Sequence, residues 1–160
     1  MDYLWTPWRY QYVKTAGAPG ECVFCAAAKT SDDSDALVVY RGQQNFVILN
    51  RFPYTSGHVM VIPYRHVATL EALDDESLTE FILLARRTEQ HLRAVYHPEG
   101  LNIGVNIGRA AGAGIAEHLH MHLLPRWTGD TNFMTTVGET RVMPEDLAIT
   151  WQKLRAAFQA

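Results

Sequence analysis

Three histidines in strict alternation are the residues of this chain best suited to chemistry. One apolar residue separates His118 from His120 and another separates His120 from His122. This period of two predicts a half-buried strand whose histidines leave one face and whose apolar residues leave the other. Because a strand rises about 3.3 Å per residue, the backbones of His118 and His122 lie about 13 Å apart. Zinc–nitrogen bonds of about 2 Å cannot gather all three rings on one ion, although neighbouring pairs could share one. The row therefore has to serve at least two purposes.

The chemistry of imidazole indicates what those purposes are. Neutral imidazole is a nucleophile near pH 7, because its unperturbed pKa is about 6.5, and a hydrogen bond from its second nitrogen makes it directional. His120 is the candidate nucleophile, since its substrate could also contact His122, which when protonated could stabilise an anion or donate to a leaving group. The loop before the histidines contains Gly108, Gly112 and Gly114, which allow the backbone to approach phosphate oxygens. Although it lacks the P-loop lysine, beside the histidines it points to a reaction at phosphorus.

Two cysteines form a second candidate site. Cys22 and Cys25 are the only cysteines and make a Cys-x-x-Cys pair. In a reducing compartment such a pair indicates metal binding or redox chemistry more than a structural disulfide. No thioredoxin-like βαβ pattern surrounds the pair, which favours a metal, and a redox pair is the alternative.

Five apolar or β-branched runs predict the strands that position these groups. They are residues 36–40, 46–49, 58–63, 101–105 and 118–123. The first two are predicted to form a hairpin, because turn-forming residues separate them. Together the runs predict an antiparallel sheet with helices packed on one face, which is an α+β domain.

Two helices are predicted around this sheet. Acidic residues 74–76 suit the positive end of a helix dipole, and that helix runs to about His97, where Pro98 and Gly100 end it. Its expected apolar face is Leu78, Ile82, Ala85, Leu92 and Tyr96. Pro144 suits the first turn of a closing helix, whose face is Leu147, Trp151, Leu154 and Phe158. Residues 1–20 are rich in aromatic residues and proline, and we expect an irregular arm followed by a single domain over residues 21–160.

The composition of the whole chain excludes several classes of protein. The 160 residues suffice for one compact domain with a sizeable core. A net charge of −3 provides no basic field for nucleic acid. No apolar run is long enough to span a membrane, and the N-terminus lacks the pattern of a signal peptide. We therefore expect a cytoplasmic protein with no nucleic-acid or membrane partner.

The histidine row resembles the signature of a known superfamily. His118-Leu-His-Met-His-Leu-Leu is similar to the histidine triad (HIT) pattern His-φ-His-φ-His-φ-φ, with φ apolar, and Ser56-Gly-His58-Val-Met-Val-Ile-Pro63 resembles its upstream strand. Residues 4–9, 48–50, 116–120 and 125–130 look most like bacterial diadenosine-tetraphosphate phosphorylases, which resemble the fragile-histidine-triad branch. The resemblance implies a HIT-like fold, an antiparallel sheet of about five strands with a long helix and a C-terminal helix.

The resemblance also implies roles for single residues. His120 matches the nucleophile that attacks an α-phosphate and forms a nucleotidyl-histidine intermediate, and His122 matches the residue beside the phosphate oxygens and the leaving side. Asn50 matches a contact to the ribose hydroxyls. The implied substrate-binding residues are Asn50, His58, Asn106, Gly112 and Gly114. A histidine at position 122 departs from the galactose-1-phosphate uridylyltransferase branch, which disfavours sugar-nucleotide transfer.

Some histidine-triad branches resemble this chain in pairing two cysteines with two histidines. The matching positions are His66 and His118, which with Cys22 and Cys25 would complete a tetrahedral Cys₂His₂ site. We expect structural zinc there and no organic cofactor. A catalytic ion on His120 and His122 is the disfavoured alternative.

The expected function is that of a histidine-triad nucleotide hydrolase or nucleotidylyltransferase. It would cleave a phosphoanhydride bond of an adenine nucleotide or dinucleotide, such as a diadenosine polyphosphate, by hydrolysis or phosphorolysis. A nucleoside phosphoramidase and a non-catalytic nucleotide-binding adaptor are the alternatives, and nucleic-acid end processing has little support. The resemblance implies a homodimer or higher homo-oligomer, and the aromatic residues of the arm suggest a covered surface.

Overall fold

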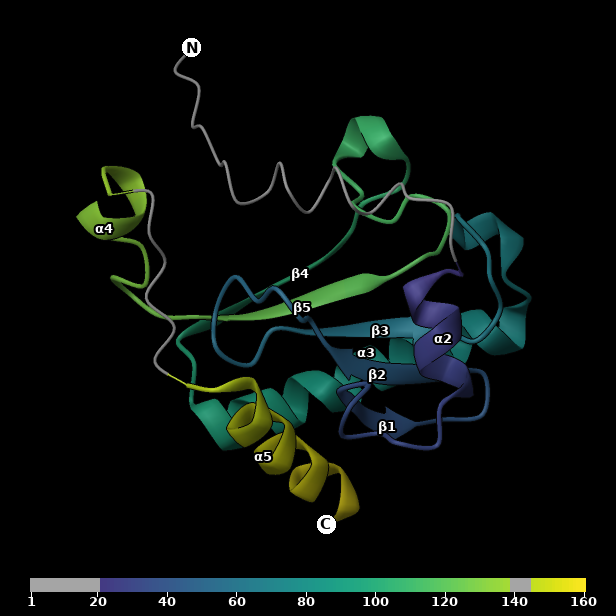
Figure 1. Ribbon diagram of the computed structural model, residues 1–160, viewed down its shortest axis with the longest axis horizontal. Helices are drawn as coiled ribbons and strands as arrows, with labels where there is room; N and C mark the ends of the chain where they lie inside the picture. Colours follow the sequence, from purple (N-terminus) through teal and green to yellow (C-terminus); the bar gives the residue numbers. More distant parts are fainter. Residues whose placement is uncertain (1–20, 139–144) are drawn as a thin grey trace.

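The fold is built on one antiparallel sheet of five strands, seen in a computed structural model that describes residues 21–138 and 145–160 (Figure 1). The strand order is β1-β2-β3-β5-β4. The strands are β1 (Val38–Arg41), β2 (Asn45–Leu49), β3 (Val59–Pro63), β4 (Gly100–Val105) and β5 (Met121–Arg126). This architecture confirms the predicted α+β class and the number of strands. The predicted arm of residues 1–20 and the predicted helix start at Pro144 lie outside the described residues.

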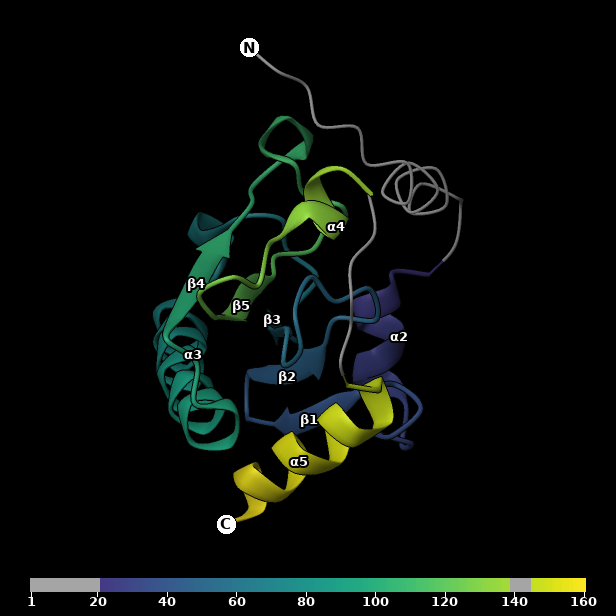
Figure 2. The same ribbon diagram turned by 90° about the vertical axis from the view of Figure 1, so that its left-hand side faces the viewer.

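Helices cover both faces of the sheet, and not one face as predicted. They are α2 (Val23–Lys29), α3 (Asp75–Tyr96), α4 (Phe133–Thr136) and α5 (Leu147–Gln159), with short 3₁₀ turns at Leu70–Ala72 and Arg109–Ala111. In Figure 2 the sheet lies between α3 and α2. The main core joins α3 and α5 to alternate strand residues such as Val61 and Leu123. A second core, which includes Phe24, Ile48 and Met60, lies under α2 on the opposite face.

The histidine segment keeps its predicted alternation, but its paired strand starts later than predicted. Leu119, Met121 and Leu123 are all buried. The ladder to β3 begins only at Met121, which pairs with Val61. Continuing this register would place Leu119 opposite Pro63, which has no N–H to donate. The N–H of Leu119 donates instead to the carbonyl of Val67, at 2.6 Å.

The long helix α3 has the predicted ends, and its buried face includes the predicted Ala85 and Leu92 but not Ile82. Asp74 caps its start by accepting a hydrogen bond from the N–H of Ser77, and His97 ends it in the left-handed conformation. The prediction placed Ile82 on the buried face, but its side chain is 51% exposed. The buried stripe consists of Ser77, Phe81, Leu84, Ala85, Thr88 and Leu92. This stripe follows the 3.6-residue period one position away from Ile82, because the larger Phe81 fills the core.

The two edges of the sheet differ in their covering. At β1, the Trp151 indole N–H donates to the carbonyl of Val38 and the Arg155 guanidinium to that of Val39, both from α5. The outer edge of β4 pairs with no strand in the described part of the chain, and Ile103 on it is 46% exposed. No helix in the described ranges combines the length and apolarity that crossing a bilayer requires.

Candidate active site and metal cluster

A pocket of about 530 Å³ lies between α2 and the histidine face of the sheet. Its floor includes Ile48 and Met60, which are adjacent to each other on β2 and β3. Six of the predicted site residues line it, namely Asn50, Asn106, Gly112, Gly114, His120 and His122. The structure therefore brings together residues that are up to 72 positions apart in the chain, from Asn50 to His122.

His120 is held in a defined orientation at the end of this pocket. Its Nδ1–H donates to the carbonyl oxygen of His118 at 2.8 Å. In the neutral ring this leaves the lone pair on Nε2, which is the nitrogen free to attack. The side chain is 4% exposed, and burial lowers the pKa of His120 despite the opposing effect of the backbone hydrogen bond. The ring therefore stays neutral and nucleophilic at neutral pH.

His122 receives its orientation from a buried neighbour. The N–H of Tyr54 donates to Nδ1 of His58 at 3.2 Å, so the proton of a neutral His58 sits on Nε2. That Nε2–H donates to Nδ1 of His122 at 2.9 Å. In this tautomer Nδ1 of His122 accepts a hydrogen bond, which leaves Nε2 as the nitrogen available to a substrate. The ring centroids of His122 and His120 are 4.9 Å apart.

His58 lies behind His122 and not on the pocket wall. The family resemblance implied that His58 binds substrate, but the residue is only 1% exposed. Its contact with the substrate would therefore pass through His122. The sequence analysis missed the role of the Tyr54 backbone, because nothing in the residue type signals a backbone donor.

Asn50 follows β2 and turns its amide toward the same histidines. Its Oδ1 accepts a hydrogen bond from the N–H of Phe52 at 2.9 Å. Nδ2 is consequently the group that faces His58, 3.5 Å from its Nε2. Asn50 therefore offers the pocket an N–H donor, which suits a hydroxyl or phosphate oxygen.

The loop of residues 106–114 forms the opposite rim. Gly108 and Gly112 have φ values of 81° and 86°, a region that disfavours residues with a Cβ. Arg109 lies between them, exposed and 3.8 Å from Glu117. Asn106, Gly112 and Gly114 line the same pocket as His120 and His122, and phosphate binding by this loop stays a prediction.

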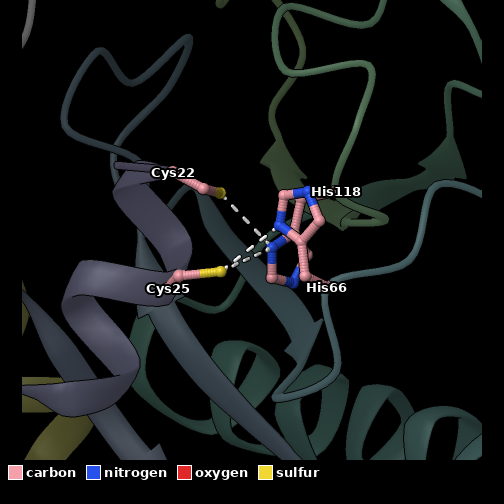
Figure 3. A group of neighbouring side chains, drawn as sticks. All are labelled: Cys22, Cys25, His66 and His118. Carbon is pink, nitrogen blue, oxygen red and sulfur yellow. Dashed lines mark hydrogen bonds between the residues drawn. The ribbon is translucent and has the colours of Figure 1, made fainter. Parts of the chain in front are cut away.

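The predicted metal ligands form a compact cluster beside α2 (Figure 3). Cys22 and Cys25 extend from the start of α2 toward His66 and His118, and the four ligand atoms lie within 4.8 Å of one another. The shortest contact is 3.3 Å, between Cys25 Sγ and His66 Nδ1. Cys22 Sγ is 3.4 Å from Nδ1 of His118.

This donor set fits a divalent metal ion. The Nε2–H of His118 donates to the carbonyl of Pro63 at 2.9 Å, which fixes the ring and leaves Nδ1 for a ligand bond. Burial lowers the pKa of His118, so the ring is neutral as metal binding requires. Burial and then Cys22 raise the pKa of the Cys25 thiol. A cation between the thiols would oppose that effect by stabilising both thiolates.

The seven-residue helix α2 is the part of the site that the sequence analysis missed. Phe24, Ala27 and Thr30 form one wall of the pocket. The three consecutive alanines at residues 26–28 are a helix signal that could have found it.

Fold and site together define a class of protein. It is a single-sheet α+β protein that presents an oriented, neutral histidine to a nucleotide-sized pocket, beside a Cys₂His₂ cluster. The family model described as HIT domain matches residues 31–129. The chain is 40% identical to an AP-4-A phosphorylase of Mycobacterium tuberculosis, over 94% of this chain and 80% of the relative. It belongs to the histidine triad (HIT) family.

Solved structures of the same family superpose on most of the chain. A Zn-bound histidine triad family protein from Mycobacterium smegmatis gives a TM-score of 0.68 at 30% identity, over 87% of this chain and 94% of that one. A hypothetical histidine triad nucleotide-binding protein from Sulfolobus tokodaii gives 0.69 at 25% identity, over 86% and 92%. These similarities confirm the resemblance inferred from the motifs.

Proposed function

We propose that the protein is an enzyme that cleaves a phosphoanhydride bond of an adenine nucleotide or dinucleotide, such as a diadenosine polyphosphate. The observation that carries this proposal is the orientation of His120, whose Nδ1 is engaged by the carbonyl of His118 and whose ring lines a pocket of about 530 Å³. The similarity to an AP-4-A phosphorylase supports the choice of substrate.

The reaction divides one displacement into two. Nε2 of His120 attacks a phosphorus atom, a P–N bond forms, and the P–O bond to the leaving phosphate breaks with its electron pair on that oxygen. The ring retains its proton on Nδ1 and becomes positively charged. The hydrogen bond from Nδ1–H of His120 to the carbonyl of His118 is stronger when the ring is charged than when it is neutral. Water or phosphate then attacks the same phosphorus and releases His120.

The neighbouring groups supply hydrogen bonds to the anionic substrate. The rings of His122 and His120 are neighbours, with centroids 4.9 Å apart, and an Nε2–H of His122 would bind the phosphate or leaving oxygen. Asn50 would bind a ribose hydroxyl, and the loop containing Asn106, Gly112 and Gly114 would surround the phosphates. His58 would act by fixing the tautomer of His122.

The test combines one substitution with product analysis. His120→Ala should abolish turnover of diadenosine tetraphosphate and keep nucleotide binding, whereas His97→Asn at the exposed end of α3 should have full activity. Mass spectrometry of quenched wild-type enzyme should show a nucleotidyl group on His120. Near-normal turnover by His120→Ala would contradict the mechanism. Binding without release of any product would favour an adaptor instead.

The same assay identifies the second step. Resolution of an adenylyl intermediate by water yields AMP and ATP from diadenosine tetraphosphate. Resolution by inorganic phosphate yields ADP and ATP, because the phosphate joins the adenylyl group. Product analysis with and without phosphate therefore separates a hydrolase from a phosphorylase.

We also propose that the Cys₂His₂ cluster holds structural zinc. Cys22, Cys25, His66 and His118 would be its ligands, and the ion would tie the start of α2 to the sheet and take no part in the chemistry on the substrate. The Zn-bound relative from Mycobacterium smegmatis supports this choice. Metal analysis of protein purified without chelators should give about one zinc per chain, and a protein with none would contradict it.

A homodimer is the proposed assembly. The open edge of β4, with Ile103 and the nearby Ile107 exposed, offers an apolar strand edge that natural proteins usually cover. The opposite edge at β1 is protected by α5. Light scattering at micromolar concentration should give at least twice the chain mass, and Ile103→Lys should reduce it. A wild-type monomer would refute the proposal.

The proposed organisation is one HIT domain over residues 21–160 preceded by an arm. The proposed location is the cytoplasm, since both cysteines are free thiols and a reducing compartment keeps them available to a metal. Neither nucleic acid nor a membrane is a proposed partner.

A further inference from the structure

Helix α2 depends on contacts at both of its ends. Its seven residues (Val23–Lys29) are fewer than an isolated helix needs to be stable in water. At its start, Cys22 occupies the N-cap position, but its side chain makes no capping hydrogen bond. The thiol of Cys22 instead faces the cysteine–histidine cluster, 3.4 Å from Nδ1 of His118. At its end, the Arg41 guanidinium donates to the carbonyls of Ala27, Ala28 and Thr30.

Helix α2 lies between the cysteine–histidine cluster and the pocket that contains His120. Phe24 lies between the two metal-binding cysteines in the sequence, and its ring contacts both sites. Its centroid is 5.4 Å from that of His118 in an edge contact and 5.3 Å from that of His120 in a tilted one. Phe24, Ala27 and Thr30 line the pocket, so any movement of α2 changes the pocket wall and the surface against which His120 packs.

We propose that a divalent cation in the Cys22–Cys25–His66–His118 cluster regulates the active site, because it fixes the start of α2 and thereby holds Phe24 against the ring of His120. Phe24 is in this view a positioning residue. The nucleotide-binding part of the inference rests on the proposed function, whereas the ordering of α2 by the cation does not.

The physical reason is the difference between the two states of the cluster. With a cation, four ligand bonds join the start of α2 to His66 and His118. Without it, only hydrogen bonds and packing would hold the start of α2 against His66 and His118. Arg41 still holds the other end, so α2 moves at its start and the pocket wall opens near His120. The main core under α3 and α5 includes no residue of α2, so the domain stays folded.

Two matched substitutions isolate the cluster. His66→Ala removes a ligand that lies outside α2 and outside the pocket lining, and the neighbouring Arg65→Ala removes an exposed side chain paired only with Asp74 among the described ion pairs. For each variant, and for wild-type protein after chelation and after zinc is restored, we would measure the Kd for AMP by calorimetry. Amide hydrogen exchange of residues 23–29 would be compared with that of α3.

The expected results are specific to α2. Chelation and His66→Ala should raise the Kd for AMP at least tenfold and accelerate exchange at residues 23–29, while α3 stays protected. Zinc should restore the wild-type values, and Arg65→Ala should match wild type. Phe24→Ala should keep its zinc and still bind AMP weakly, which a purely structural role of the metal would not predict.

Each other outcome has a definite meaning. Unchanged AMP affinity and unchanged exchange at residues 23–29 after chelation would overturn the proposal. Loss of protection throughout α3 would also overturn it, because the metal would then stabilise the whole domain. If zinc-loaded wild type bound no AMP, the proposed function would fail, and the exchange of α2 would still decide whether the cation orders the helix.

Discussion

Replacing Arg41 by methionine would remove the anchor at the end of α2 while keeping a side chain of similar length. The guanidinium makes three hydrogen bonds of 2.8 to 3.0 Å to carbonyls at the end of the helix and pairs with Asp33 at 2.8 Å. A helix leaves its last four carbonyls without partners, and here one side chain serves two of them and the carbonyl of the C-cap residue Thr30. In Arg41→Met they would have to bind water.

The magnitude follows from the number and exposure of these bonds. A hydrogen bond to a charged group contributes about 1.5–3 kcal/mol net. The Arg41 side chain is 28% exposed, and water can replace it at the carbonyls, so the total loss is about 2–3 kcal/mol and not the sum of four bonds. For a domain of this size that lowers the melting temperature by about 5–10 °C.

Urea and thermal unfolding of Arg41→Met and Arg93→Met would test this reasoning. Arg93 makes an exposed pair with Glu89 one turn away on α3, and its loss should cost at most about 0.5 kcal/mol. Arg41→Met should also bind AMP more weakly, because α2 forms the pocket wall. Equal stability of the two variants would refute the view that Arg41 anchors α2.

Three further predictions concern the rest of the domain. Glu80 accepts hydrogen bonds from two backbone N–H groups of the β1–β2 turn and from Asn45. Burial raises its pKa, but these bonds outweigh burial and the net pKa is lowered. Glu80→Gln should therefore cost about 1–3 kcal/mol in urea unfolding at pH 7, and less as the pH falls through the lowered pKa; an equal cost at pH 3 would contradict this. Burial and then Arg87 lower the pKa of His91 from its ordinary value of 6.5, so its contribution to stability is complete above pH 6.5 and is lost as the pH falls toward the lowered value. The melting temperature of His91→Phe should consequently fall less than that of wild type between pH 8 and pH 5. Trp151→Phe removes one hydrogen bond to a carbonyl of β1 and should cost about 1 kcal/mol, and a cost of zero would show that α5 does not hold this edge.

The fold could be predicted from the sequence wherever a local pattern of residues is compatible with only one secondary structure. The alternation of Leu119, Met121 and Leu123 with polar residues predicted which side chains enter the core, because a strand turns successive residues to opposite faces. The acidic start of α3 and its end near His97 were equally local, since helix termini are set by capping within one turn. The error at Ile82 arose because two apolar stripes compete on α3 and only the packing partner selects Phe81.

For the candidate site, too, some features follow from the sequence and others only from the tertiary structure. The sequence alone determined which residue types were present, namely three alternating histidines, a cysteine pair and a glycine-containing loop. Tertiary structure alone decided what each could do. The ring of His122 is oriented by His58, which is 64 residues away, and the carbonyls at the end of α2 are held by Arg41 of β1. A hydrogen-bond direction or a short helix of this kind depends on contacts between distant segments, whereas period and capping depend only on neighbours in the chain.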